Sequence, residues 1–172
     1  SKMMQAIIAL PQPVIAQVQG IATAAGCQLV ATCDLAIAAD SARFATNGIH
    51  NGLYCATPQV ALSRVVPRKH ALEMLLTGDF ISANEAYRIG LYNHLVDSGE
   101  KVVDAARNLA AALAKAPTAA LSATKKALQQ ELSMDFSTAL DQEAKLQASF
   151  MKHADFREAY NAFVAKRPPR FS

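Results

Sequence analysis

The pattern of apolar and polar positions divides the chain into two segments of different texture. Up to about Val96, short runs of apolar and β-branched residues alternate with Gly and Pro. After Ser98, the chain is rich in Ala and Lys, has apolar residues at helical spacing, and contains no glycine beyond Gly99. Short apolar runs bounded by glycine are typical of buried strands, whereas a spacing of three to four residues is typical of amphipathic helices. The pattern therefore predicts an α/β segment over residues 1–97 and a helical segment over residues 98–172.

Within the α/β segment, the pattern predicts a helix at the start of the chain, strands at 13–20, 34–39, 42–46 and 93–96, helices at 24–32, 58–66 and 69–76, and a loop at 47–58. Ser82 and Glu85 have the spacing of a capping box, and Gly90 is a suitable left-handed end for the helix that follows. The later segment predicts helices over 100–115, 117–132 and 136–152, with a closing helix from near Asp155. Because the first residues already have helical spacing and lack an initiator Met, we expect either a fragment or a chain whose front was lost or never encoded.

Composition limits the classes of function. The 172 residues are 52% hydrophobic and 18% charged, and 17 Lys and Arg against 14 Asp and Glu give a net charge of only +3. That charge is too small to favour nucleic-acid binding. The three cysteines are odd in number and form no C-x-x-C pair, which predicts free thiols in a reducing compartment and no metal site. Glutamines and an aspartate interrupt the long apolar stretch at 14–39, so no membrane span is expected.

Three segments, in order, carry a resemblance to a known family: PVIAQVQGIATAAGCQLVATCDLAIAADSARFAT, LTGDFISANEAYRIGLYNHLV and AFVAKRPPRF. The chain resembles the crotonase (enoyl-CoA hydratase/isomerase) superfamily over nearly its whole length. The resemblance implies an α/β fold with a crotonase-like (ClpP/crotonase) spiral ββα core, incomplete at the N-terminus, followed by a helical C-terminal trimerisation region. It also implies a homotrimer or dimer of trimers in the bacterial cytoplasm or the mitochondrial matrix.

The resemblance implies an acyl-CoA thioester as the ligand and fatty acid metabolism as the setting, with coenzyme A as part of the substrate and no separate cofactor. Family members stabilise the negative charge on the thioester oxygen with two backbone N–H groups. The resemblance assigns one of them to Ala25, at a helix start whose dipole adds to the effect, and places Gly26 beside the substrate. The alternative from the residues alone is that this Ala-Gly pair lets a helix and a strand approach closely.

The two glutamates that hold water in family hydratases match Gln28 and Gly48. Glutamine can orient water but cannot take its proton, and glycine has no side chain. We therefore expect standard hydratase activity to be absent or weak. His50 is a possible general base, although a lone loop histidine also suits a surface hydrogen bond. Tyr54 and Cys55 are candidate substrate contacts, although a cysteine here also suits a small buried residue.

The closing segment supplies the last candidates. The resemblance implies that Phe163 covers the adenine and that Lys166 attracts the 3′-phosphate of coenzyme A. A packing stripe with solvated terminal charges is the alternative. Three readings of the whole chain stay open: an enzyme or former enzyme of the lyase or isomerase class, a noncatalytic acyl-CoA binder or interaction subunit, and a truncated product that must associate to cover its core.

Overall fold

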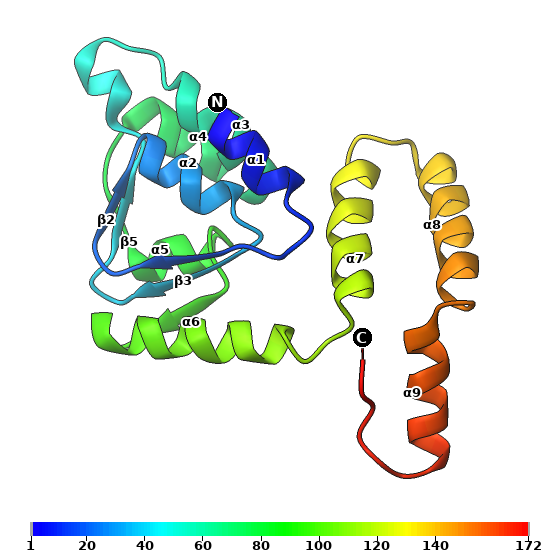
Figure 1. The fold of residues 1–172 in the computed structure, drawn as a ribbon. Coiled ribbons are helices and arrows are strands. Elements are labelled where there is room, and N and C mark those ends of the chain that lie inside the picture. The colour runs from blue at the N-terminus through cyan, green and yellow to red at the C-terminus, as the bar shows by residue number, and fades with distance from the viewer. Residues whose placement is uncertain (1, 172) are drawn as a thin grey trace. The chain divides into compact units, whose positions relative to one another are not determined.

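A computed structural model describes residues 2–171 of the chain (Figure 1). These residues form two compact units. One unit contains the chain up to Leu10 together with Val14–Ala110, and the other contains Pro11–Pro13 together with the chain from Ala111 on. The first unit is mixed α/β and the second is helical, so the predicted fold class is confirmed. The boundary after residue 97 stays a prediction about domain organisation.

Two small sheets form the centre of the first unit. In one sheet, β1 (Ile15–Val18), β3 (Leu35–Ala39) and β6 (His94–Val96) run parallel in the order β1-β3-β6. In the other, β4 (Arg43–Ala45) pairs in parallel with β2 (Ile21–Thr23) and antiparallel with β5 (Ile81–Ser82). The strands β2 and β5 were not predicted. They have three and two residues, which is too short for a period of two to be visible in the sequence.

The helices of this unit confirm the predicted ones with shifts at their ends. They are α1 (Lys2–Ala9), α2 (Ala25–Thr32), α3 (Ala56–Val65), α4 (Arg68–Thr77), α5 (Ala83–Arg88) and α6 (Gly99–Leu113). The prediction of a loop over 47–58 was too broad. The short 3₁₀ helix η1 (Asn47–Asn51) occupies its beginning, and α3 starts inside its end. A left-handed Gly52, with φ 69°, ends η1.

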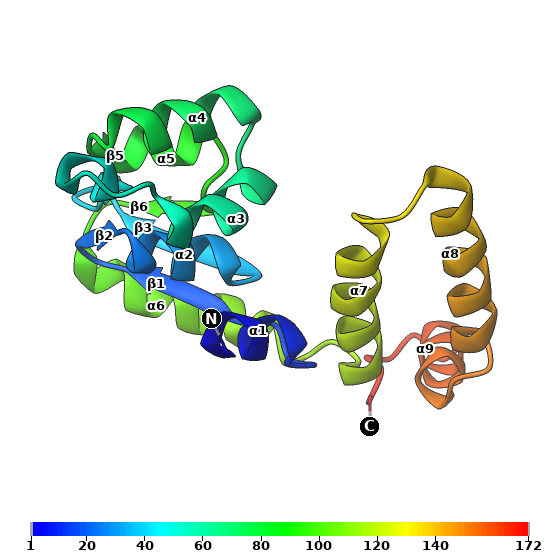
Figure 2. The same cartoon turned by 90° about the horizontal axis from the view of Figure 1, so that it is seen from above.

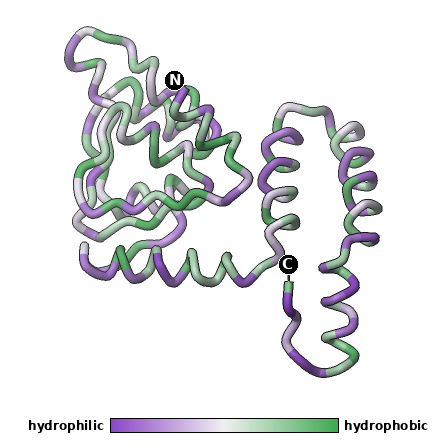
Figure 3. Tube along the Cα trace, in the orientation of Figure 1, coloured by the Kyte–Doolittle hydropathy of each residue, from purple (hydrophilic) through white to green (hydrophobic). Residues whose placement is uncertain are grey.

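Alternate residues of β3 face different helices. Ile37 and Ala39 pack with Val102 of α6, whereas Ala36 and Ala38 belong to the core cluster that includes Val30 of α2. Figures 1 and 2 show α6 and α2 on opposite sides of this sheet. Figure 3 shows hydrophobic and hydrophilic segments alternating along α6, as a helix with one face on a sheet requires. The sheet is thus buried on both faces, which explains its continuous apolar sequence.

Only half of the predicted capping box forms. The Ser82 hydroxyl accepts a hydrogen bond from the N–H of Glu85 over 3.2 Å, as predicted. The Glu85 carboxylate does not reach back, because it accepts two hydrogen bonds from the Arg88 guanidinium, at 2.7 and 2.6 Å. The helix ends as expected at Gly90, whose φ is 83°.

The second unit contains α7 (Thr118–Glu131), α8 (Phe136–Phe150) and α9 (Ala154–Val164). Asp135 caps α8 by accepting the N–H of Thr138 over 3.0 Å. His153 caps α9, since its Nδ1 accepts the N–H of Asp155 over 3.2 Å. The Ser122 hydroxyl donates to the Pro11 carbonyl over 2.9 Å. Between residues 2 and 171, no helix is both long enough and apolar enough to cross a membrane.

Candidate functional site

The entry into α2 depends on the backbone conformation of Ala24. This residue has φ 47° and ψ −111°, a combination that residues with a side chain rarely adopt. Its N–H donates to the Ala45 carbonyl over 3.0 Å, and its own carbonyl accepts the N–H of Gln28 over 3.0 Å. The bond from Gln28 to Ala24 is the first hydrogen bond within the helix. The amides of Ala25, Gly26 and Cys27 therefore precede it and have no intrahelical acceptor.

This helix start has the electrostatics of an anion site. Ala25 is exposed, and the first turn of α2 contains no acidic residue. The N-terminal end of a helix carries a partial positive charge, so its first N–H groups can stabilise an oxygen that becomes negative. Such a group can donate to a thioester carbonyl as charge builds on it. Among the described residues, no group of three or more His, Cys, Asp and Glu side chains could hold a metal ion.

The sheet brings two predicted positions to one edge. Thr23 of β2 pairs with Ala45 of β4, and the strands are parallel. The chain enters α2 directly after β2 and enters η1 directly after β4, so Ala25 and Gly48 both follow the carboxyl ends of neighbouring strands. Ligands of open α/β sheets commonly bind outside this edge.

The two positions that match the family glutamates differ in their surroundings. Gln28 is half-buried in α2, and its carbonyl accepts a hydrogen bond from the Thr32 hydroxyl over 2.7 Å. Gly48 lies in η1, and a β-carbon built on it would meet the Cys55 sulfur and the Leu53 carbonyl oxygen. Neither position presents a carboxylate, as the sequence required.

His50 attaches η1 to the end of α4. Its Nε2 lies 2.7 Å from the Thr77 carbonyl and 3.8 Å from a carboxylate oxygen of Asp79. The side chain is 53% exposed. Donation from Nε2 to a carbonyl suits the predicted local hydrogen bond, and the catalytic role of His50 stays a prediction.

The sequence did not indicate any role for Thr46. It is fully buried; its hydroxyl donates to the Met74 carbonyl over 2.6 Å, and its own carbonyl accepts the Cys55 thiol over 2.7 Å. Tyr54, the neighbour of that cysteine, is 75% exposed. A polar residue directly after the buried A-x-F-A strand was the only available signal, because its partners Cys55 and Met74 lie 9 and 28 residues further along the chain, beyond the reach of local patterns.

Cys27 is buried completely, and this burial raises the pKa of its thiol to about 12. The thiol therefore stays protonated near neutral pH and is a poor nucleophile. The side chain behaves as a small apolar core residue in the same helical turn as the exposed residue Ala25.

In the second unit, Phe163 and Lys166 lie at the end of α9. Phe163 is 82% exposed, so it packs little within the chain itself. Lys166 has φ 51°, and its N–H donates to the Phe163 carbonyl over 3.1 Å. The next residue, Arg167, makes two hydrogen bonds to the Glu158 carboxylate, at 2.6 and 3.0 Å. Arg167 is thus paired within the chain, whereas the Lys166 side chain is exposed.

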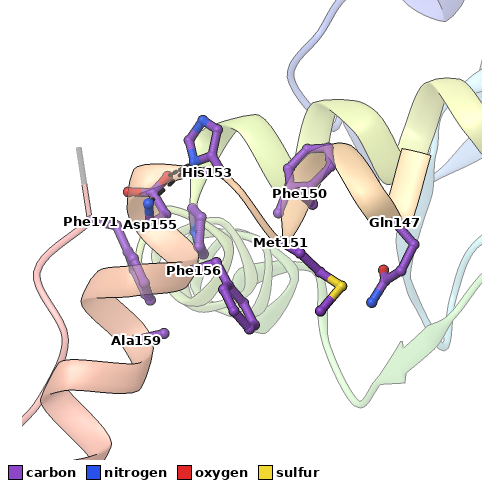
Figure 4. Close-up of a pocket in the computed structure, with 10 residues that line it drawn as sticks. Gln147, Phe150, Met151, His153, Asp155, Phe156, Ala159 and Phe171 are labelled. Atoms are coloured by element: carbon purple, nitrogen blue, oxygen red, sulfur yellow. Dashed lines mark hydrogen bonds and ion pairs between the residues drawn. The ribbon is translucent and has the colours of Figure 1, made fainter. Parts of the chain in front are cut away.

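The second unit also contains a cavity of about 230 Å³ (Figure 4). Its walls are mainly apolar and include Phe150, Phe156 and Phe171, and neither Phe163 nor Lys166 lines it. Asp155 is 6% exposed at its edge, and an oxygen of its carboxylate lies 3.3 Å from Nδ1 of His153. This cavity was not predicted from the sequence.

Comparison with known proteins identifies the family and the fold. The model of the family "Enoyl-CoA hydratase/isomerase" matches residues 1–172. The mitochondrial enoyl-CoA hydratase domain-containing protein 3 of Homo sapiens is 44% identical over 172 residues, which are 100% of this chain and 56% of that protein. The crystal structure of that human protein has a TM-score of 0.94 at 43% identity, covering 99% of this chain and 67% of that chain.

A crystal structure of an enoyl-CoA hydratase from Mycobacterium smegmatis also has a TM-score of 0.94, at 44% identity, covering 98% of this chain and 65% of that one. The chain spans a little over half the length of the curated relatives it matches first. The family model nevertheless matches the chain from end to end, and the solved structures share its crotonase-type fold. The chain belongs to the enoyl-CoA hydratase/isomerase family.

Proposed function

We propose that this chain binds an acyl-CoA thioester and stabilises negative charge on the thioester oxygen with the N–H of Ala25. The observation that carries the proposal is the start of α2. There, the unusual backbone of Ala24 and its bond to Ala45 precede the exposed residue Ala25, whose first-turn amide has no intrahelical acceptor at the carboxyl edge of β2 and β4. A fixed N–H of this kind needs no reorganisation when charge develops on the ligand. Membership of the family supports the choice of a thioester as the ligand.

The proposed chemistry is enolate stabilisation without standard hydration. Hydration needs a group that takes a proton from water, and neither Gln28 nor Gly48 supplies one. The alternative is a noncatalytic acyl-CoA binder or interaction subunit. The absence of any side chain at position 48 favours the noncatalytic binder over a hydratase. An assay of turnover distinguishes a noncatalytic binder from an enzyme with a different reaction.

We propose that Phe163 and Lys166 contact the adenine and the 3′-phosphate of coenzyme A. An aromatic ring that is 82% exposed at the end of α9 can stack on a base. The exposed Lys166 can attract a phosphate, while its neighbour Arg167 is occupied by Glu158.

We further propose that the chain assembles as a homotrimer or a dimer of trimers through its helical unit. Large apolar side chains on α7, α8 and the turn between them support this, since Leu128, Leu132 and Phe136 are 58%, 74% and 80% exposed. Exposed apolar residues in such numbers mark an interaction surface. Sedimentation equilibrium tests the proposal, and a monomer at micromolar concentration would contradict it.

We propose the mitochondrial matrix or the bacterial cytoplasm as the location. The matched relatives named enoyl-CoA hydratase domain-containing protein 3 are described as mitochondrial. The three cysteines form no disulfide with one another, which is compatible with either reducing compartment.

The proposed function is tested by titrating the chain with acetoacetyl-CoA while the near-ultraviolet absorbance of its enolate is recorded. We expect saturable binding and a larger enolate fraction at constant pH, because an N–H donor stabilises the charged oxygen. Coenzyme A alone, which lacks the thioester, is the matched ligand and should bind more weakly. Equal binding of both ligands with no enolate signal would contradict the role of Ala25, and an absence of binding to either would contradict the whole proposal.

A further inference from the structure

The surroundings of Gly48 leave little room for a side chain. A β-carbon built on this residue would lie 3.2 Å from the Cys55 sulfur and 3.7 Å from the Leu53 carbonyl oxygen. The first distance is shorter than ordinary van der Waals contact, so the sulfur would have to move by a few tenths of an ångström. Position 48 therefore points into its own loop, toward the thiol of residue 55.

The thiol is held where it is. Cys55 is 8% exposed, and its sulfur donates to the Thr46 carbonyl over 2.7 Å. Thr46 is itself fully buried, and its hydroxyl is bonded to the Met74 carbonyl of α4. Rotation of the thiol would break its hydrogen bond and leave the Thr46 carbonyl without that donor, which is costly for a buried group.

The loop between the two residues is also closed by backbone bonds. The N–H of Leu53 donates to the Gly48 carbonyl over 3.1 Å, and the N–H of Gly52 donates to the Ile49 carbonyl over 3.0 Å. These bonds fix the distance between residue 48 and the start of α3. A side chain at position 48 cannot be accommodated by simply opening the loop.

We propose that Cys55 is the positioning residue that excludes a side chain, and hence a carboxylate, from position 48. This inference rests on the proposed function, because position 48 matches a glutamate that holds water in family hydratases. The absence of a glutamate at position 48 then depends on two residues together, Gly48 and Cys55. A carboxylate at 48 requires a smaller residue at 55.

A double-mutant cycle tests the pairing without using activity. We expect Gly48→Ala alone to raise the unfolding equilibrium constant about fivefold, as overpacking of a filled site does. In a Cys55→Ala background, the same change should have no such effect or lower the constant about twofold, because alanine restricts the unfolded chain more than glycine does. Gly20→Ala is the matched control, since no atom lies within 4 Å of a β-carbon built there.

Cys55→Ser separates packing from hydrogen bonding. Serine keeps a donor for the Thr46 carbonyl but replaces sulfur with a smaller atom, so it should also relieve the effect of Gly48→Ala. If Gly48→Ala has the same effect in all three backgrounds, the two positions are independent and the proposal is wrong.

The ligand readout distinguishes failure of this inference from failure of the proposed function. Acetoacetyl-CoA is titrated into Gly48→Glu with Cys55 intact and into Gly48→Glu with Cys55→Ala. We expect only the double variant to be both folded and altered in its affinity for acetoacetyl-CoA. The stability cycle can show coupling while the folded double variant binds acetoacetyl-CoA with unchanged affinity. In that case position 48 is not part of the ligand site, but Cys55 still packs against it. If the chain binds acyl-CoA but the changes at positions 48 and 55 affect stability independently, Cys55 does not have the proposed role and the proposed function still holds.

Discussion

The N–H of Ala24, the first residue after β2, donates to the carbonyl of Ala45, the last residue of β4, over 3.0 Å. This bond extends the pairing into the turn that starts α2. It also holds Ala24 at φ 47° and ψ −111°, where its β-carbon is crowded. The direction of the Ala25 amide thus depends on the strained residue before it and on the hydrogen bond that this residue donates to β4.

Ala24→Gly should stabilise the protein by about 1 kcal/mol. Glycine adopts positive φ without steric cost, and the strain it removes exceeds the extra entropy that it adds to the unfolded chain. Urea denaturation measures the change as a higher midpoint at constant slope. Ala6→Gly, at an exposed position within α1, is the control and should lower the stability by about 1 kcal/mol. Equal destabilisation by the two changes would show that the backbone of Ala24 is not strained.

Hydration of crotonyl-CoA by this chain should be absent or very weak. The reason is that Gln28 and Gly48 offer no base to activate water. The measurement is the loss of the enoyl thioester absorbance, made on a sample already shown to bind acetoacetyl-CoA. Robust turnover that disappears in His50→Gln or Tyr54→Phe would contradict this prediction and identify a different proton-transfer group.

Lys166→Ala should weaken the affinity for coenzyme A several-fold at low ionic strength and by a smaller factor at high ionic strength. The attraction between an exposed lysine and a phosphate is screened by salt, with a Debye length of about 10 Å at 0.1 M. Calorimetric titration at two salt concentrations gives both values. Lys126→Ala removes an equal charge from an exposed position of α7 and should not change the affinity. If both variants behave alike, the end of α9 is not part of the ligand site.

Glu158 should contribute to stability in a manner that depends on pH. Hydrogen bonds from the Arg167 guanidinium, and then from the N–H of Arg170, lower the pKa of this carboxyl from 4.5 to about 2. A carboxyl whose pKa is lower in the folded state stabilises fully above its unfolded pKa and loses this contribution as the pH falls through its folded pKa. The contribution is therefore complete above about pH 4.5 and disappears between that value and about pH 2.

The measurement is the melting temperature of the wild type and of Glu158→Gln across this range. We expect the wild type to melt higher near neutral pH, with a difference that narrows on acidification. Glu143→Gln removes one negative charge from an exposed position of α8 and serves as the control. A difference that does not vary with pH would mean that Arg167 and Arg170 do not bind the carboxylate in solution.

Local sequence patterns were sufficient for most of the helices. Ser82 and Gly90 were recognised from the sequence as the start and end signals of α5, because caps act over three to four residues. The second half of the capping box was predicted wrongly, since Arg88 competes for Glu85 from one turn away. The residues of the candidate site came from family resemblance at quoted motifs, and no local pattern would have found them.

The sequence by itself determined the order of the helices and of the strands β1, β3, β4 and β6, the buried character of β3, the family, and the absence of carboxylates at positions 28 and 48. Only the tertiary structure decided that β2 and β5 exist, since such short strands form only through partners distant in the chain. It also decided the backbone of Ala24 and the closeness of Cys55 to Gly48. These features depend on contacts between segments that are separate in sequence, whereas helix periodicity and capping are encoded within a few consecutive residues.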